Sequence, residues 1–99
     1  MIVVLGQFEF HPDDFEAVKL LAAALMRETV KEDGCIKYVF AADLTRPDCL
    51  QLSELWRDDA ALTAHLATSH IQAYREALKP LRIISRLVQR YEAAEGRDL

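Results

Sequence analysis

The sequence predicts an α+β domain in which four antiparallel strands form one sheet and the helices lie on one face of it. Its 99 residues suit one domain with one hydrophobic core. Runs of β-branched and aromatic residues alternate with helical patterns in the order β-α-β-β-α-β, and no repeat or internal linker interrupts them. This order is that of a ferredoxin-like plait over a single domain, residues 1–99.

The first half of the chain predicts one strand and one long helix. Residues 2–10 alternate β-branched and aromatic side chains and predict a strand. The segment 11–14, with Pro12 and two aspartates, is typical of a helix start. Apolar residues then recur at helical spacing from Phe15 to Thr29, and Gly34 is a suitable C-cap.

A hairpin is predicted next, with strands at residues 35–43 and 49–57 and a turn between them. If it centres on Arg46, the numbers of paired residues sum to 92 and almost every side chain on one side is apolar. The predicted pairs are Ala42 with Leu50, Phe40 with Leu52, Tyr38 with Glu54 and Ile36 with Trp56. Cys35 and Cys49 would then lie about eight positions apart, roughly 25 Å along a strand, which excludes a disulfide between them.

The second half predicts two helical segments and a last strand. Asp58-Asp59 caps a helix over 60–66, and Ser69 caps a second segment over 70–78 that Pro80 stops. Residues 82–91 predict the fourth strand, and 92–99 form a polar tail.

Composition excludes several classes of function. A net charge of −4 is the wrong sign for a nucleic-acid binder. No apolar run approaches the ~18–20 residues of a membrane span, and no basic region precedes the apolar N-terminus. We therefore expect a cytoplasmic protein that binds neither nucleic acid nor a membrane.

An apolar excess predicts a homodimer. The hydrophobic share is 52%, slightly above the ~45–50% of soluble domains. Helices on one face leave the other face of the sheet open, although an open face should be more polar than this one. The apolar residues assigned to that face are Val3, Leu5, Val39, Ala41, Leu55, Ile84 and Val88.

One stretch resembles a known family. Between Glu54 and Tyr74 the chain reads E-x-W-x-D-x-A-A-L-x-x-H-x-x-T-x-H-x-x-x-Y, after Asp33-Gly34-Cys35 and Tyr38. It resembles the antibiotic biosynthesis monooxygenase-like family of small dimeric α+β barrels, which includes quinol monooxygenase-like members. The resemblance implies a pocket between sheet and helices in each subunit, and O₂ chemistry on a small electron-rich aromatic without flavin or metal. An isomerase of a small oxygenated metabolite, or a non-catalytic ligand-binding or stress-response protein, stays open as an alternative.

A haem-degrading branch of the same superfamily fits this chain poorly. It has Asn on the first strand, Trp where this chain has His65, and an axial His where this chain has Tyr74-Arg75-Glu76. The first strand here offers Gly6 and Gln7. No dinucleotide or phosphate-binding motif is present either, so we expect no cofactor.

His65 and Glu54 are the candidate catalytic residues. A histidine titrates near working pH, with a free pKa of ~6.5, and could act as a general base. Glu54 lies in an apolar row and must be paired or face a pocket, where it could orient His65 or pair with the Tyr38 hydroxyl. A structural histidine at the core edge is the alternative. His65 and His70 straddle a helix break with rings on different faces, so we predict no metal site.

Aromatic residues are the candidate substrate pocket. They suit a flat ligand, although aromatic residues on a covered sheet face more often form plain core. They are Phe8, Tyr38, Phe40, Trp56 and Tyr74. Arg82, Arg86 and Arg90 share one side of the last strand, near Arg75 and Lys79, either as solvated charges or as a guide for an anionic substrate.

Overall fold

The computed structural model describes residues 1–99 and has the predicted element order. A short 3₁₀ turn, η1, precedes the first helix, so the helix begins one turn later than its proline suggests. The elements are β1 (Ile2–Phe10), η1 (Pro12–Asp14), α1 (Phe15–Thr29), β2 (Cys35–Ala42), β3 (Cys49–Trp56), α2 (Asp59–Leu66), α3 (Ser69–Leu78) and β4 (Ile83–Glu92). None of the helices is long and apolar enough to cross a membrane.

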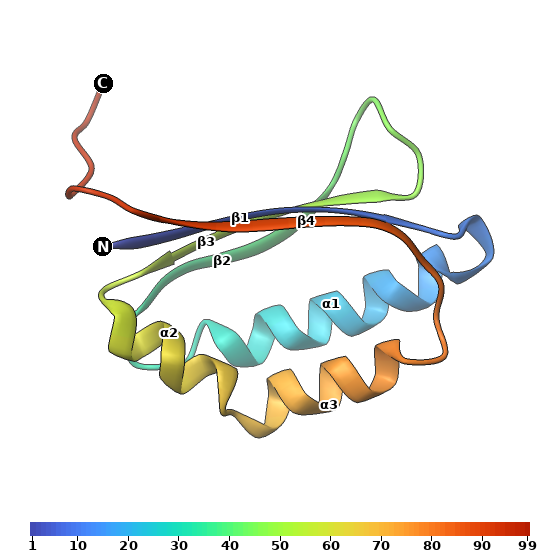
Figure 1. The fold of residues 1–99 in the computed structure, drawn as a ribbon, viewed down its shortest axis with the longest axis horizontal. Helices are drawn as coiled ribbons and strands as arrows, with labels where there is room; N and C mark the ends of the chain where they lie inside the picture. The colour runs from blue at the N-terminus through green and yellow to red at the C-terminus, as the bar shows by residue number, and fades with distance from the viewer.

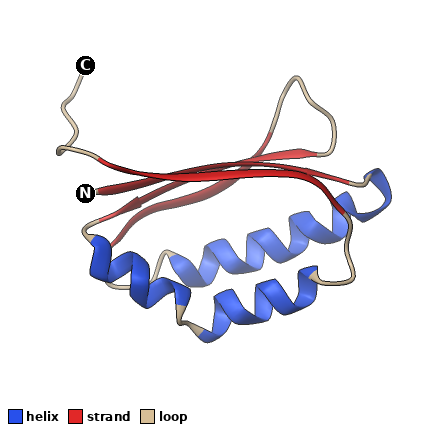
Figure 2. Cartoon of the chain, in the orientation of Figure 1, coloured by secondary structure: helices blue, strands red, loops and turns tan.

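The four strands form one antiparallel sheet in the order β2-β3-β1-β4. All three helices lie on the same side of this sheet, and its other side is uncovered (Figures 1 and 2). The ferredoxin-like α+β fold predicted from the element order is therefore confirmed.

The hairpin register is confirmed along most of its length. Tyr38 pairs with Glu54, and the two pairs nearer the turn also match the prediction. The prediction is wrong at the far end, where a bulge makes Cys35 rather than Ile36 the partner of Trp56. Ile36 is the extra residue of this bulge, and 57% of its surface is exposed. Both cysteines are free; Cys35 and Cys49 lie at opposite ends of the hairpin.

Side-chain caps fix the two short helices. Asp58 accepts a hydrogen bond from the Ala61 backbone N–H at 2.8 Å and starts α2. Thr68, and not the predicted Ser69, caps α3 by accepting from the Ile71 N–H at 3.3 Å. The Thr68 hydroxyl also donates to the carbonyl of His65 at 2.8 Å. This one threonine therefore links the end of α2 to the start of α3.

The face assignment on β4 needs correction. A second bulge lies between Glu9 and Phe10, and it puts Ile84 out of register. Val88 pairs with Gly6 and packs against the buried core, so it does not belong to the open face. Leu87 and Tyr91, 58% and 46% exposed, pair with Gln7 and Val3, so their side chains share the open face with these residues.

Candidate functional site

His65 lies in the last turn of α2 and is almost completely buried, with 2% of its surface exposed. Its ring packs against two neighbouring aromatic side chains of the sheet. The ring centroids of Trp56 and Tyr38 are 4.9 and 5.2 Å away. This packing fixes the plane of the imidazole, so the directions in which Nδ1 and Nε2 can form hydrogen bonds are fixed as well.

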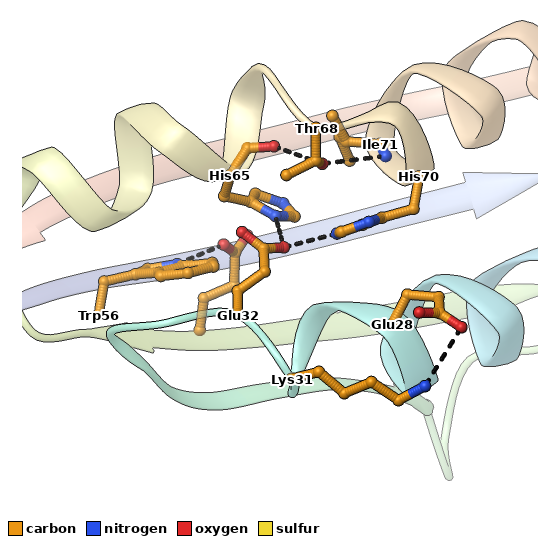
Figure 3. Close-up of polar contacts among 9 residues, drawn as sticks. Glu28, Lys31, Glu32, Trp56, His65, Thr68, His70 and Ile71 are labelled. Atoms are coloured by element: carbon orange, nitrogen blue, oxygen red, sulfur yellow. Dashed lines mark hydrogen bonds and ion pairs between the residues drawn. The ribbon is translucent and has the colours of Figure 1, made fainter.

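Glu32, which the sequence analysis did not single out, is the partner of His65. It follows α1, in the turn that leads to β2, and its side chain is 12% exposed. Figure 3 shows its carboxylate between two imidazole rings, with Oε2 2.7 Å from His65 Nδ1 and 2.6 Å from His70 Nε2. Since a carboxylate only accepts hydrogen bonds, both nitrogens donate to it.

This contact determines the chemistry of His65. A proton held on Nδ1 leaves Nε2 of the neutral ring as an acceptor, which is the form a general base needs. Burial lowers the pKa of His65 below 6.5, while Glu32 opposes the shift. The imidazole is therefore neutral at neutral pH and able to accept a proton.

The prediction that the rings of His65 and His70 lie on different faces is wrong. His65 and His70 converge on Glu32, with ring centroids 6.1 Å apart. The three side chains offer ligand atoms within 4.8 Å of one another. Ligand atoms around a tetrahedral zinc lie roughly 3.3 Å apart, since each is about 2.0 Å from the metal. The shorter oxygen–nitrogen distances here are those of hydrogen bonds, and the absence of a metal stays a prediction.

Glu54 has a different partner from either of those expected. Its Oε1 accepts a hydrogen bond from the Trp56 indole N–H at 2.8 Å, and no hydrogen bond joins it to His65 or to the Tyr38 hydroxyl. The side chain is buried on β3, and burial raises its pKa to about 7. Near neutral pH Glu54 is thus partly protonated and able to donate or accept a proton.

A cavity of about 670 Å³ lies between the sheet and the helices α2 and α3. His65 and Glu54 both line it, together with four of the five predicted aromatic residues, Phe8, Tyr38, Phe40 and Tyr74. We call this cavity the pocket.

The fifth aromatic residue, Trp56, does not line the pocket. It is fully buried, contacts Tyr38 edge-on and belongs to the core. Burial raises the pKa of Tyr74 to about 12, so its hydroxyl stays protonated and can donate to a ligand oxygen. The pocket therefore combines apolar walls with an imidazole, a carboxyl group and a phenol.

Comparison with known proteins identifies the family. The family model described as antibiotic biosynthesis monooxygenase matches residues 1–77. The chain belongs to this family. The Escherichia coli protein named Probable quinol monooxygenase YgiN, a member of similar size, is 32% identical over 89 residues, which cover 80% of this chain and 86% of that protein.

Two further relatives match nearly the whole of this chain, one by sequence and one by structure. An uncharacterized protein of Synechocystis is 31% identical over 98 residues, 99% of this chain and 67% of that protein. A crystal structure from Deinococcus radiodurans has a TM-score of 0.92 at 26% identity and covers 100% of this chain and 98% of the other. The match supports the family resemblance that the motif around His65 indicated.

Proposed function

We propose that the chain is a monooxygenase that oxidises a small electron-rich aromatic compound, of the quinol or anthrone type, with O₂ and without a cofactor. The observation that carries the proposal is the buried Glu32–His65 pair, which holds the imidazole as a base beside an aromatic-lined pocket. Family membership and the similarity to a quinol monooxygenase relative support the same reaction class.

The first step is removal of a proton from the bound substrate by His65. Nε2 takes the proton from a phenolic O–H or from a carbon acid next to a carbonyl group. The imidazolium that forms is stabilised by the Glu32 carboxylate 2.7 Å from Nδ1, as in other carboxylate–histidine pairs. The apolar walls keep water away from the substrate anion and make it a better electron donor.

The second step is the reaction of this anion with O₂. The anion gives one electron to O₂, and the substrate radical and superoxide then combine through a new C–O bond. Protonation gives a hydroperoxide, which loses water to leave one oxygen atom on the substrate. An anthrone-type CH₂ group plus O₂ thus gives C=O plus H₂O, and all four electrons that reduce O₂ come from the substrate.

Glu54 is placed to supply the proton for the departing water. It lines the same pocket as His65, and its pKa of about 7 keeps part of it protonated at neutral pH. A base with a lowered pKa and an acid with a raised pKa form a complementary pair. Tyr74 supplies a second fixed donor for a substrate oxygen.

We also propose that the protein is a homodimer through the open face of its sheet. Leu5, Leu87 and Tyr91 are large apolar residues with 49%, 58% and 46% of their surface exposed, and they share that face. Large apolar residues exposed together on one face are typical of a protein–protein interface. A second copy of the chain offers the same face, and packing the two faces together would bury the apolar residues of both copies.

Oxygen uptake with a panel of quinols and anthrones tests the reaction. We expect uptake above the autoxidation blank, with one atom from isotope-labelled O₂ in each product molecule and no accumulation of hydrogen peroxide. Substrate-dependent proton exchange without oxygen uptake would instead identify an isomerase. Binding without either reaction would identify a ligand-binding protein, and both results would refute the monooxygenase.

A further inference from the structure

Positive charge gathers at the pocket although the chain as a whole is acidic. The sequence has 12 Lys and Arg residues against 16 Asp and Glu residues. Four of those cations line the pocket, but only one of the acids, Glu54, does so. The four are Arg75, Lys79, Arg86 and Arg90. Glu54 is also partly neutral at neutral pH, so it offsets only part of this positive charge.

Two of these cations have carboxylate partners and two do not. Arg90 forms an ion pair with Asp59 at 2.6 Å, and Lys79 forms one with Glu76 at 2.8 Å. Neither Arg75 nor Arg86 has an ion pair or a side-chain hydrogen bond in this structure. Two arginines without a carboxylate partner therefore line the same cavity, Arg75 from α3 and Arg86 from β4.

The sheet register places the free arginine of β4 away from the catalytic pair. Val4 lies between Glu54 on β3 and Arg90 on β4, so these three form one row across the sheet. Arg86 is four residues from Arg90, roughly 13 Å along the strand, and pairs with Phe8. A ligand that extends from Glu54 along the sheet toward Arg86 crosses the aromatic part of the pocket.

We propose that the substrate is an aromatic acid whose carboxylate is bound by Arg86 and Arg75 while its electron-rich ring lies at His65 and Glu54. This inference rests on the proposed function for the reacting end, and it adds the charged group at the other end. A planar guanidinium matches a planar carboxylate with two parallel hydrogen bonds. Thirteen of the nineteen pocket residues are hydrophobic, which suits one small charged group on an otherwise apolar ligand.

Anaerobic calorimetric titration tests the preference without any oxygen chemistry. The probes are a 1,4-dihydroxybenzene that carries a carboxylate and the matched carboxamide, which has the same shape and no charge. We expect the acid to bind at least roughly tenfold more tightly to the wild-type protein, as one charge-assisted hydrogen bond allows. The preference should shrink as salt is added, because both arginines are partly in solvent.

Arginine variants then locate the preference. Arg86→Gln and Arg75→Gln should each weaken binding of the acid by roughly tenfold and leave binding of the carboxamide unchanged. Arg27→Gln, which removes the same charge from the exposed end of α1, is the matched control and should change neither. Equal affinity of acid and carboxamide for the wild type would overturn the proposal. So would no binding of the acid at millimolar concentration, or an equal loss for both probes in Arg86→Gln.

The outcome is separable from that of the monooxygenase proposal. Selective binding of the acid without oxygen uptake would support the anion site and refute the reaction. Oxygen uptake with the carboxamide as fast and at as low a KM as with the acid would support the reaction and refute the anion site.

Discussion

Replacing Glu32 by Gln separates the charge of this side chain from its hydrogen bonds. The amide oxygen of Gln can accept the same two N–H groups, from His65 Nδ1 and His70 Nε2, that the carboxylate accepts at 2.7 and 2.6 Å. The packing around His65 should therefore persist. The free energy of unfolding should fall by roughly 2 kcal/mol, because two hydrogen bonds to a charged acceptor become hydrogen bonds to a neutral one. A much larger loss of stability would mean that the amide cannot adopt this geometry.

The expected loss of activity follows from the kind of hydrogen bond that remains. A hydrogen bond to a charged group contributes ~1.5–3 kcal/mol, against ~0.5–1.5 kcal/mol for a neutral one. A difference of about 1.5 kcal/mol, felt when the imidazole of His65 becomes positive, lowers kcat roughly tenfold. Glu28→Gln, the same change on the exposed end of α1, should leave kcat unchanged.

The pH profile gives a second readout that a structural role would not move. His65 acts as a base only when neutral, so activity rises as pH rises through its pKa. Glu32 raises that pKa, and its neutralisation should move the acidic limb of the profile to lower pH. Steady-state oxygen uptake from pH 5 to 9, with thermal melting alongside, measures both effects. Wild-type kcat with an unmoved acidic limb would refute the role assigned to Glu32.

Three other predictions address the base, the buried carboxyl group and the dimer. His65→Gln and His65→Ala should both lower turnover by ~10²–10⁴, measured as oxygen uptake. His65→Gln should have the higher melting temperature of the two, because truncation of the fully packed imidazole to Ala leaves a void. Wild-type turnover in either variant would contradict the role of His65 as the base. Burial raises the pKa of Glu54 to about 7 in the folded protein, against 4.5 in the unfolded chain, so the native state holds the proton of this side chain more tightly. The free energy of unfolding should therefore fall by roughly 3 kcal/mol as pH rises from 4.5 to 7. Urea unfolding should show this loss in the wild type and not in Glu54→Gln. Light scattering should give twice the 11.3 kDa of one chain, and Leu87→Glu on the open face should give a monomer; a monomeric wild type at micromolar concentration would contradict the interface.

The order of the elements along the chain and most of the hairpin register could be predicted because their signals are local. Alternation in a strand has a period of two, so a wrong register would have put Tyr38 and Phe40 on the wrong face. The bulges could not be predicted in this way. The extra residue at Ile36 and the one at Ile84 each shift the pattern by one position, and nothing in the local alternation marks either.

The candidate site was predictable only in part. His65 stands out because a histidine interrupts an apolar helix stripe, and Glu54 because it is a carboxylate in an apolar row. Glu32 is separated from His65 by 33 positions and from His70 by 38, and only the packing of three separate segments brings them together. A glutamate in a turn carries no sequence signal of that kind, so the sequence pattern assigns to Glu54 the contact with His65 that Glu32 makes.

The single tryptophan of the chain is positioned to act as a built-in optical probe. The indole of Trp56 is shielded from solvent, donates to Glu54 at 2.8 Å and lies 4.9 Å from the ring of His65. Ionisation of either neighbour changes the electric field at the excited indole, so the emission of the unlabelled protein should report both titrations. Because Trp56 does not line the pocket but contacts His65 and Glu54, which do, a ligand can alter that emission without touching the fluorophore.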